Sequence, residues 1–278
     1  MSTLFVTSAL LARAGVVHGF SLRTGGVSTG PFASLNVSRA VGDEREAVEE
    51  NLRRLAQAAG RSGAQAFATA KQVHRDRLLL VRSSASRIEF DELFAASEPE
   101  AAQVSGEQST RSEAEPEADA ILSRTPGLAA AVRVADCTPI LLSAPDVRAG
   151  CAVHSGWRGA RLSIASRGVQ ALASLGADRA RILAAIGPCI GRCCYVVSAE
   201  LALSFRAEFG AEVADDPARV EAPHLDLRLC AAIALGRAGL GLAQIEQVGG
   251  CTSCDSENYF SHRRDQGRTG RHLAFIAP

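Results

Sequence analysis

Three residues with metal-binding side chains stand at the ends of apolar segments of the chain. They are His74, Cys137 and His154. The segments that lead into them, each expected to form a β-strand, are residues 67–73, 128–134 and 150–153. A thiolate and two imidazoles suit zinc, and three protein ligands leave one tetrahedral position open for water or substrate. The sequence therefore indicates a catalytic zinc site, with copper as the alternative metal.

The same residues are compatible with other roles. Their separations match no short metal-binding motif, so a buried cysteine and two hydrogen-bonded histidines would give the same pattern. Cys137 and His154 could also form a nucleophile and its base. Two aspartates beside these segments, Asp119 and Asp136, are candidates for proton transfer or for orienting an imidazole. We expect the catalytic residues to be Cys137, Asp136 and Asp119.

Three loops combine an arginine with small or polar residues and could bind an anion. They are residues 23–26 with Arg23, residues 155–159 with Arg158, and residues 261–265 with His262 and Arg263. The second is expected to lie between a strand and a helix, where backbone N–H groups can face a phosphate. A guanidinium adds charge-assisted hydrogen bonds. An ordinary surface turn is the alternative for each loop, and none of them is a P-loop or a dinucleotide-binding motif.

A second group of cysteines contains a C-x-x-C pair. The pair is Cys251 and Cys254, and Cys189, Cys193 and Cys194 precede it in the chain. Zinc ribbons and redox sites use such pairs, but a four-cysteine metal site usually needs a second well-formed pair. The spacing of the three earlier cysteines does not provide one. We therefore expect ordinary thiols that line or support a pocket.

The composition excludes several classes of function. The 278 residues are 47% hydrophobic and 22% charged, as in a soluble globular protein. The 30 basic and 30 acidic residues give a net charge of zero, which argues against a nucleic-acid partner. No apolar run approaches the roughly 20 residues that span a membrane, and the N-terminus lacks a basic, cleavable leader. We expect a cytoplasmic protein with reduced thiols.

Strand-like and helix-like segments alternate along most of the chain, which predicts a mixed α and β fold. Residues 44–59 form the clearest amphipathic helix, which Gly60 ends. Further helices are expected at residues 160–175, 199–209 and 227–238. Further strands are expected at residues 16–22, 78–81, 120–122, 140–142, 181–186, 245–248 and 272–277. Residues 98–117 lack large apolar side chains, so we expect a mobile, solvated insertion there.

Several short motifs occur in a recognisable order. They include His18-Gly19-Phe20-Ser21, Arg23-Thr24-Gly25-Gly26, Ser34-Leu35-Asn36, Lys71-Gln72-Val73-His74, Val134-Ala135-Asp136-Cys137, Val153-His154-Ser155-Gly156-Trp157-Arg158-Gly159, Cys194-Tyr195 and Ser261-His262-Arg263-Arg264-Asp265. Together they resemble the laccase-domain family, the YfiH-like purine nucleoside phosphorylases formerly described as multicopper polyphenol oxidases. The resemblance covers nearly the whole chain except residues 98–117.

The resemblance implies a single domain over residues 1–278. Its fold would be a four-layer α/β/β/α sandwich with mixed sheets, shared with the catalytic part of cytotoxic necrotising factor toxins. The family's three metal ligands align with His74, Cys137 and His154. Substrate or phosphate contacts are expected at Arg23, Asn36, Arg158, His262 and Arg263.

The activity that the resemblance implies is zinc-dependent phosphorolysis of purine nucleosides. The partners would be phosphate and adenosine, inosine, guanosine or methylthioadenosine, and adenosine deamination would be a second activity. Two residues depart from the family pattern and could alter substrate preference: Val196 stands where Glu is common, and His262 where Tyr is frequent. The alternatives are a Cys–His amidase that edits a peptidoglycan precursor and a copper-dependent polyphenol oxidase, for which six histidines are few.

Overall fold

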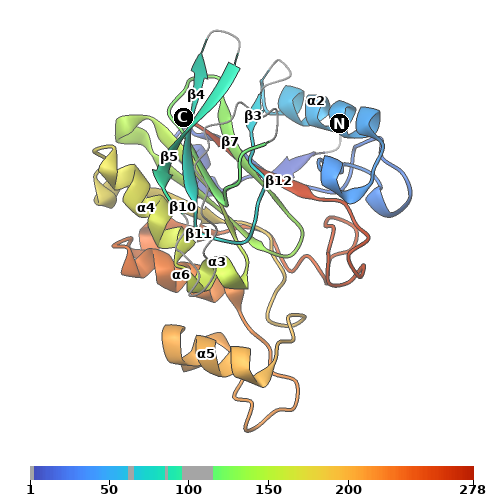
Figure 1. The fold of residues 1–278 in the computed structure, drawn as a ribbon, viewed down its shortest axis with the longest axis vertical. Helices are drawn as coiled ribbons and strands as arrows, with labels where there is room; N and C mark the ends of the chain where they lie inside the picture. The colour runs from blue at the N-terminus through green and yellow to red at the C-terminus, as the bar shows by residue number, and fades with distance from the viewer. Residues whose placement is uncertain (1–2, 62–65, 85–86, 96–114) are drawn as a thin grey trace, which may run out of the picture.

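Two mixed β-sheets stack face to face between layers of helices in the computed structural model of the chain (Figure 1). The structure describes residues 3–61, 66–84, 87–95 and 115–278. Within these residues, one sheet has five strands in the order β1-β2-β12-β7-β3, and the other has seven in the order β11-β10-β8-β9-β6-β4-β5. Each sheet contains parallel and antiparallel pairs. The predicted four-layer α/β/β/α arrangement is confirmed.

The elements alternate along the chain much as the sequence predicts, except that the strand expected at residues 67–73 is confined to Phe67–Ala68. The five-stranded sheet consists of β1 (Phe5–Val6), β2 (Val17–Ser21), β3 (Phe67–Ala68), β7 (Ala129–Val134) and β12 (His272–Ala277). The seven-stranded sheet consists of β4 (Leu78–Ser84), β5 (Arg87–Phe94), β6 (Ala120–Ser123), β8 (Thr138–Ala144), β9 (Ala149–Ser155), β10 (Leu183–Ile186) and β11 (Ile245–Gln247). The α-helices are α1 (Ala9–Arg13), α2 (Arg45–Ala58), α3 (Trp157–Arg161), α4 (Ile164–Ser174), α5 (Ala199–Phe209) and α6 (Leu227–Arg237).

The central strands are apolar on both faces because each is covered on both sides. In β8, Leu141 packs into the cluster between the sheets, whereas Ile140 and Leu142 pack toward the helices. In β7, Val132 belongs to the cluster between the sheets and Ala131 to the cluster with α2. Successive side chains of a strand point to opposite faces, so a strand covered on both sides needs apolar residues throughout. The continuous apolar runs of the sequence follow from this.

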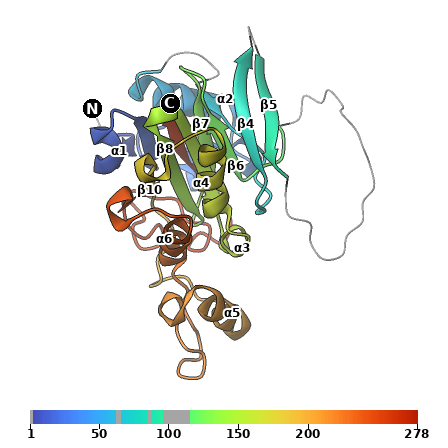
Figure 2. The same cartoon turned by 90° about the vertical axis from the view of Figure 1, so that its left-hand side faces the viewer.

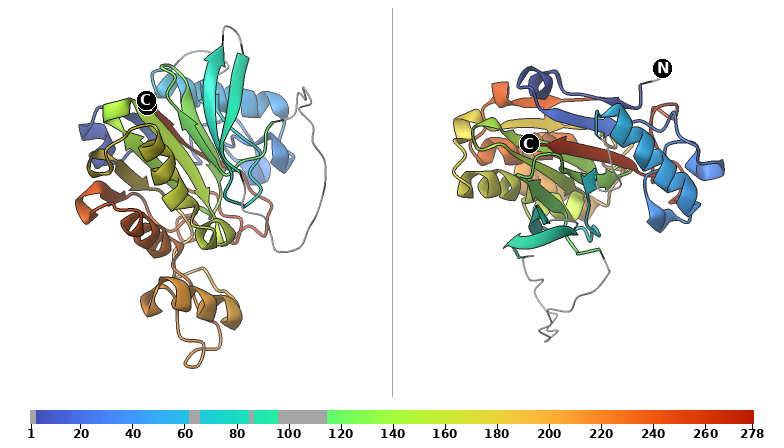
Figure 3. Two further views of the ribbon diagram at one scale, coloured as in Figure 1. Left: turned by 60° about the vertical axis from the view of Figure 1, so that its left-hand side comes forward. Right: turned by 90° about the horizontal axis from the view of Figure 1, so that it is seen from above.

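Helices cover the outer face of each sheet. On the five-stranded sheet, α2 packs Leu55 against Leu273 and Phe275. On the seven-stranded sheet, α4 packs Val169 and Leu172 into the outer cluster, to which α6 also contributes. The views in Figure 2 and Figure 3 show α4 and α6 together on this face and α5 set apart below them. Among the described residues, no helix is long and apolar enough to cross a membrane.

The structure corrects the helix expected at residues 160–175. The segment forms two helices, α3 and α4, because Ser163 between them adopts a left-handed backbone with φ of 55°. Three further elements, β1, α1 and β5, have no counterpart in the prediction. The first two are short, and β5 is an edge strand that pairs only with β4 and carries several charged residues.

The expected insertion at residues 98–117 falls mostly outside the described residues, which resume at residue 115. Its described end is held by ion pairs. Glu115 pairs with Arg133 at 3.0 Å, and Glu117 pairs with Lys71 at 2.8 Å. Residues 115–117 are therefore tied to the segment that leads to His74, which the composition of the insertion did not indicate.

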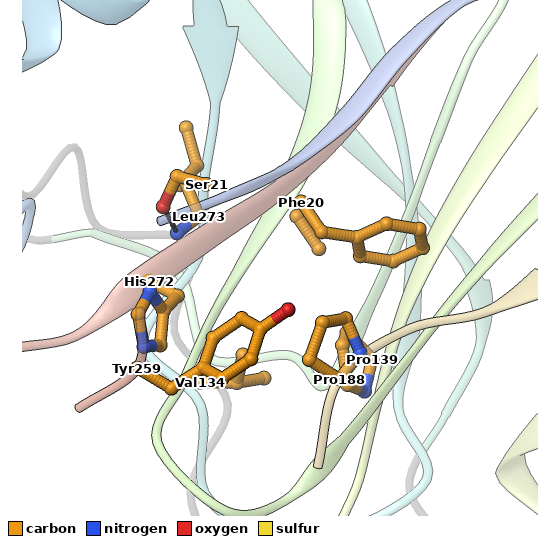
Figure 4. A pocket seen from close by; sticks show the side chains of 9 residues that line it. Phe20, Ser21, Val134, Pro139, Pro188, Tyr259, His272 and Leu273 are labelled. Atoms are coloured by element: carbon orange, nitrogen blue, oxygen red, sulfur yellow. Dashed lines mark hydrogen bonds between the residues drawn. The ribbon is translucent and has the colours of Figure 1, made fainter. Parts of the chain in front are cut away.

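A small enclosed space lies beside His272 at one end of the sheets (Figure 4). Its volume is about 10 Å³, and Phe20, Pro188 and Tyr259 lie around it. A space of this size holds at most one water molecule. His272 accepts a hydrogen bond at Nε2 from the Phe260 amide (2.7 Å), and burial lowers the pKa of its imidazole to about 3. The imidazole is therefore neutral at neutral pH.

Replacing His272 by asparagine is expected to reduce the acid sensitivity of the fold. The unfolded chain binds a proton at His272 below its ordinary pKa of about 6.5, whereas the native imidazole stays neutral until the pH nears 3. The stability that the neutral imidazole contributes is therefore fully present above pH 6.5 and is lost as the pH falls. Between pH 6.5 and pH 5, the wild-type protein should lose about 2 kcal/mol more unfolding free energy than the variant.

Urea denaturation of both proteins at the two pH values measures this difference. The comparison is made within each protein, so the cost of the substitution itself cancels. Equal losses for wild type and His272→Asn would show that this imidazole does not contribute to the pH dependence.

Candidate metal centre

Three side chains from distant parts of the sequence meet beside the β7–β8 turn. The ligand atoms of His74, Cys137 and His154 all lie within 4.8 Å of one another. The two imidazole rings meet edge to face with centroids 4.8 Å apart, and Cys137 Sγ lies 4.0 Å from His74 Nε2. Zn–N and Zn–S bonds are about 2.1 and 2.3 Å long, so small side-chain rotations would bring all three atoms onto one metal ion. The structure brings the three predicted ligands together.

Strand pairing explains why these ligands converge. In the antiparallel register of β8 and β9, Pro139 pairs with His154, so Cys137 lies beside the carboxyl end of β9. His74 lies in the segment that connects β3 of one sheet to β4 of the other. The backbone turns sharply at two points, because φ is 60° at His74 and 86° at Asp136. The centre is thus built where the two sheets meet.

The carboxylate of Asp119 holds two of the three ligands. Its Oδ1 accepts hydrogen bonds from His154 Nδ1 (2.8 Å) and from the His74 backbone N–H (2.9 Å), and its Oδ2 accepts one from the Arg75 N–H (2.8 Å). A proton on His154 Nδ1 leaves Nε2 free for a metal, and a carboxylate is the usual partner of the second nitrogen. Burial raises the pKa of the Asp119 carboxyl, but His154 and the backbone N–H groups bring it below its ordinary value.

The charges at the centre favour a thiolate on Cys137. Burial raises the pKa of this thiol, but the imidazoles of His154 and His74 lower it to about 6. Burial lowers the pKa of His154, but Cys137 and Asp119 raise it to about 10. A thiolate beside a protonated imidazole is the charge state of a Cys–His pair, and a metal ion that displaces the proton binds the same two atoms. The electrostatics therefore suit either use of the pair.

A cleft of about 440 Å³ opens over the three ligands. Ligand pockets commonly have volumes of roughly 300–1,000 Å³. Four basic residues line the cleft, namely Lys71, Arg133, Arg263 and Arg271. Lys71 and Arg133 are paired with glutamates, whereas in the described part of the chain neither Arg263 nor Arg271 has a carboxylate within 4.0 Å. These two guanidinium groups therefore have N–H donors with which an anion in the cleft could form charge-assisted hydrogen bonds.

Comparison with known proteins decides the family. The model of the family described as multi-copper polyphenol oxidoreductase laccase matches residues 17–278. The chain belongs to this laccase family. It is 35% identical to purine nucleoside phosphorylase YlmD of Geobacillus stearothermophilus over 95% of this chain and 90% of the relative. The crystal structure of YlmD superposes with a TM-score of 0.79 and 31% identity, covering 99% of both chains.

Two further relatives of this laccase-family chain carry the same kind of name. A purine nucleoside phosphorylase of Deinococcus radiodurans is 35% identical over 94% of this chain and 88% of the relative. The mouse purine nucleoside phosphorylase LACC1 is 34% identical over 98% of this chain. The chain spans only 57% of the length of the mouse protein.

Two of the five residues predicted to contact substrate or phosphate line the cleft of this laccase-family chain. They are His262 and Arg263, and the remaining three, Arg23, Asn36 and Arg158, are not among the lining residues. The flexible loops that carry arginines therefore do not all face one site, because loop orientation depends on contacts that the local sequence does not specify.

The three residues outside the cleft wall have other contacts. Arg23 donates hydrogen bonds to the backbone carbonyl groups of Ala33 and Ser256. Asn36 is completely buried and accepts a hydrogen bond from the Arg271 N–H (2.9 Å). Arg158 is exposed, and its guanidinium lies 4.4 Å from the centre of the Trp157 ring. Asn36 thus positions a cleft residue, whereas the exposed guanidinium of Arg158 lies over the ring of its neighbour Trp157.

Asp136 lies beside Cys137, but its hydrogen bonds go to the C-terminal loops. Its Oδ1 accepts a hydrogen bond from the Thr252 hydroxyl (2.6 Å). Its Oδ2 accepts hydrogen bonds from the Arg263 N–H (2.6 Å) and the Ser261 hydroxyl (3.1 Å). In this structure, the aspartate that orients an imidazole is Asp119, and Asp136 joins the cysteine's loop to the wall of the cleft.

Arg271 and Tyr195 are among the cleft residues that lie outside the predicted set. Arg271 lines the cleft and directly precedes β12. Its position beside a predicted strand is the feature of the sequence that could have identified it as a site residue. Tyr195 follows Cys194 in a motif of the family, and its ring lies 5.0 Å below the guanidinium of Arg263. Both residues became candidates only when the loops were placed in space.

Gly156 allows the ligands to approach one another. A Cβ at this position would lie 3.0 Å from Cys137 Sγ and 3.3 Å from His74 Cδ2. Carbon atoms in close-packed interiors are separated by about 3.5–4.0 Å, so the site has no room for a methyl group there. The glycine of the Ser155–Gly159 loop therefore acts through its small size beside the candidate metal ligands.

Replacing Gly156 by alanine is expected to weaken metal binding without unfolding the protein. The added methyl group must displace Cys137 or His74, and metal affinity depends on ligand positions within about 0.2 Å. We expect the affinity for zinc to fall by about 10-fold or more, the range seen when an outer-shell partner is lost. Competition with a chromophoric chelator measures the affinity. Gly236→Ala is the control, since no atom lies within 4 Å of its added Cβ. Equal affinities in the two variants would contradict the role assigned to Gly156.

Proposed function

We propose that this chain is a zinc-dependent purine nucleoside phosphorylase. It would convert adenosine, inosine, guanosine or methylthioadenosine and phosphate into the free base and a ribose 1-phosphate. The observation that carries this proposal is the location of Arg263 and Arg271, two guanidiniums without a carboxylate partner among the described residues, in the cleft over the candidate metal ligands. The names of relatives at 35% identity, which this chain covers almost completely, support the same reaction.

The two arginines are suited to hold phosphate. The guanidinium of Arg263 donates from Nη1 to the Val196 carbonyl (3.0 Å) and lies over the Tyr195 ring. Arg271 donates from Nη1 to the carbonyl groups of two residues of its own loop, each at 3.0 Å. A guanidinium has five N–H donors in a fixed plane, so both side chains keep donors for an anion. The backbone contacts fix each side chain and lower the entropy that phosphate binding would cost.

Phosphorolysis depends mainly on positioning and charge. A phosphate oxygen forms a bond to C1′ while the bond from C1′ to the purine nitrogen breaks, and the electron pair of that bond leaves with the purine, which then takes up a proton. Positive charge develops on the ribose in the transition state. Arg263 and Arg271 would hold the phosphate in line with C1′, and fixed orientation can supply a large part of the rate enhancement.

The three ligand residues fit zinc by the chemistry of their donor atoms. A thiolate and two imidazoles form a borderline-soft set, and a three-ligand set is typical of catalytic zinc sites. Zinc bound by His74, Cys137 and His154 would act as a Lewis acid and lower the pKa of bound water to about 7. Asp119 would keep His154 in the tautomer that presents Nε2. The same centre would support deamination of adenosine as a second activity.

The two departures from the family pattern differ in their position relative to the cleft. His262 is exposed and lines the cleft, so its imidazole can face the substrate. The Val196 side chain is exposed to solvent, and its backbone carbonyl holds Arg263. We therefore expect His262, and not Val196, to alter the substrate preference.

The second candidate is a Cys–His amidase, which one observation favours. Cys137, His154 and Asp119 lie in the order of a nucleophile, a base and the carboxylate that orients the base, and the His154–Asp119 bond is 2.8 Å long. Without a metal, Cys137 Sγ would form a bond to a peptide-like carbonyl carbon while the C–N bond breaks, His154 would give a proton to the leaving amine, and water would then release the acyl group. We prefer phosphorolysis, because an amidase would have no use for the guanidinium groups of Arg263 and Arg271.

Copper-dependent polyphenol oxidation is less consistent with the histidines. Multicopper chemistry needs many imidazoles, and all six histidines of the chain lie within the described residues. Of these, only His74 and His154 belong to a group with the geometry of metal ligands. His18 and His272 each accept a hydrogen bond from a backbone N–H, and His224 contacts Asp215. A single copper ion at the centre would remain compatible with the ligand set.

The purified protein with zinc, inosine and phosphate should release hypoxanthine and ribose 1-phosphate. His74→Ala should lower kcat/KM by more than the roughly 100-fold that the loss of an outer-shell partner can cost. His224→Ala, at a partly exposed histidine outside the cleft, is the matched control. Base release is followed by absorbance, with and without phosphate. Base release that needs no phosphate would contradict the proposal, and amidase activity that survives chelation but not alkylation of Cys137 would establish the second candidate.

Removing the charge of Arg271 should raise the KM for phosphate. Loss of a hydrogen bond to a charged group costs about 1.5–3 kcal/mol, so Arg271→Gln should raise this KM by roughly 10- to 100-fold. Arg271→Lys, which keeps the charge, should have a smaller effect. Arg158→Gln tests the alternative given by the sequence pattern, and we expect its KM for phosphate to stay near the wild-type value. A larger increase in Arg158→Gln than in Arg271→Gln would move the phosphate site to the start of α3.

A further inference from the structure

Four cysteine thiols outside the candidate metal centre converge on one point. The sulfur atoms of Cys193, Cys194, Cys251 and Cys254 all lie within 4.8 Å of one another. Cys254 Sγ lies 3.5 Å from Cys193 Sγ and 3.4 Å from Cys194 Sγ. The sequence pattern predicted ordinary thiols because the earlier cysteines did not form a well-spaced pair. The structure corrects the premise of that prediction, since the tertiary fold supplies the second pair.

Parallel strand pairing explains the convergence. The neighbouring strands β10 and β11 run parallel, so the loops that follow them leave the same edge of the sheet (Figure 1). The backbone pairing continues beyond the strands. Cys189 and Cys251 form an isolated parallel β-bridge through their main chains, and the Thr252 N–H donates to the Cys189 carbonyl (3.0 Å). The turn with Cys193 and Cys194 thereby meets the turn with Cys254. Cys189 itself points elsewhere, and its thiol is buried.

The spacing of the sulfur atoms suits one metal ion better than disulfide bonds. Four sulfurs bound to one zinc ion at 2.3 Å lie about 3.8 Å apart, close to the shorter separations in the cluster. A disulfide joins two sulfurs at about 2.0 Å. Cys254 has two thiol neighbours at nearly equal distance, so no single partner is selected for it. A tetrahedral ion would use all four thiols at once.

The backbone around the cluster is arranged to stabilise thiolates. The Gly191 N–H donates a hydrogen bond to Cys251 Sγ (3.1 Å), and the N–H groups of Ser253 and Cys254 also face this sulfur. The Gly191 position has no room for a side chain, because a Cβ would lie 3.2 Å from Cys193 Sγ. The guanidinium of Arg264 donates to the Thr252 carbonyl (2.8 Å), between the two cysteines of the C-x-x-C pair. Arg264 also pairs with Asp265, so it fixes the loop of the pair, and the N–H donors are the groups that offset the negative charge of a metal–thiolate complex.

We propose that Cys193, Cys194, Cys251 and Cys254 bind a structural zinc ion. Soft thiolates select zinc over calcium or magnesium, and four protein ligands close the coordination sphere. The ion would join the loop after β10 to the loop after β11. Tyr195, which lines the cleft, directly follows Cys194, and Thr252 of the C-x-x-C pair holds Asp136 beside Cys137. The second ion would thus fix one wall of the cleft, and this inference does not depend on which reaction occurs there.

Metal analysis of variants tests the proposal. The wild-type protein loaded with zinc should contain two zinc ions per chain. Cys254→Ser and His74→Ala should each contain one, because each removes a ligand of a different site. Cys230→Ala, which removes a buried thiol of α6 outside both sites, should still contain two. With cobalt in place of zinc, His74→Ala should retain the intense thiolate-to-metal absorption, and Cys254→Ser should lose most of it. A zinc content that is the same in Cys254→Ser and in Cys230→Ala would overturn the proposal.

A second measurement uses the wild-type protein, so it tests the proposal even if Cys254→Ser fails to fold. Cys193 and Cys254 are exposed, so iodoacetamide should modify both rapidly if no metal binds them. In the zinc-loaded protein, both should be protected, and a chelator should restore their modification. Mass spectrometry of peptides reads out each cysteine. Rapid modification of both at full zinc loading, or a disulfide between Cys254 and either neighbour in the native protein, would overturn the proposal.

Discussion

The buried carboxylate of Asp119 is the contact on which the candidate centre depends. It accepts hydrogen bonds from the His154 imidazole and from the backbone N–H groups of Val73, His74 and Arg75. A buried carboxylate without partners would cost several kcal/mol, so these donors are needed for the charge to remain inside the protein. The same bonds hold His74 in a left-handed backbone conformation that an L-residue adopts at a cost of about 1 kcal/mol or more. One side chain therefore fixes an imidazole on β9 and the loop between β3 and β4.

The position of Asp119 relative to the sheets gives this contact its importance. It directly precedes β6, an interior strand of the seven-stranded sheet, while the loop of His74 arrives from the edge of the five-stranded sheet. The stacked sheets are rigid because their facing strands are buried on both sides. Because His74, Cys137 and His154 are attached to both sheets, their positions are held equally firmly. The exposed part of the site, by contrast, consists of loops whose arginines are held by backbone carbonyls.

The sequence indicated the strands and the three residues that converge at the centre better than it indicated the wall of the cleft. Apolar runs mark strands that are covered on both faces, and Cys137 and His154 lie near the ends of such strands, so the pairing of β8 with β9 brings them together. His74 lies in a loop instead, because β3 ends at Ala68, and its hydrogen bond to Asp119 places it. The directions of Arg23 and Arg158 depend on a few contacts that no local pattern encodes: those of Arg23 with two carbonyl groups and the Phe260 ring, and that of Arg158 with the Trp157 ring. The convergence of Cys193 and Cys194 with the C-x-x-C pair, which their spacing argued against, depends on a similar long-range contact. It exists only because β10 and β11 are neighbours in space, and long-range pairing is not written in short motifs.

The two cysteine-containing sites are joined by a short hydrogen-bonded path. Thr252 lies between Cys251 and Cys254, and its hydroxyl donates to Asp136, the residue before Cys137. Asp136 has a left-handed backbone, so its conformation needs support from outside the turn. Asp119 provides comparable support for His74 on the opposite side of the centre. The centre is thus held from the interior by a carboxylate and from the C-terminal loops by the contacts of Asp136. Order in those loops, which the proposed second ion would supply, then determines how firmly the cysteine ligand is held.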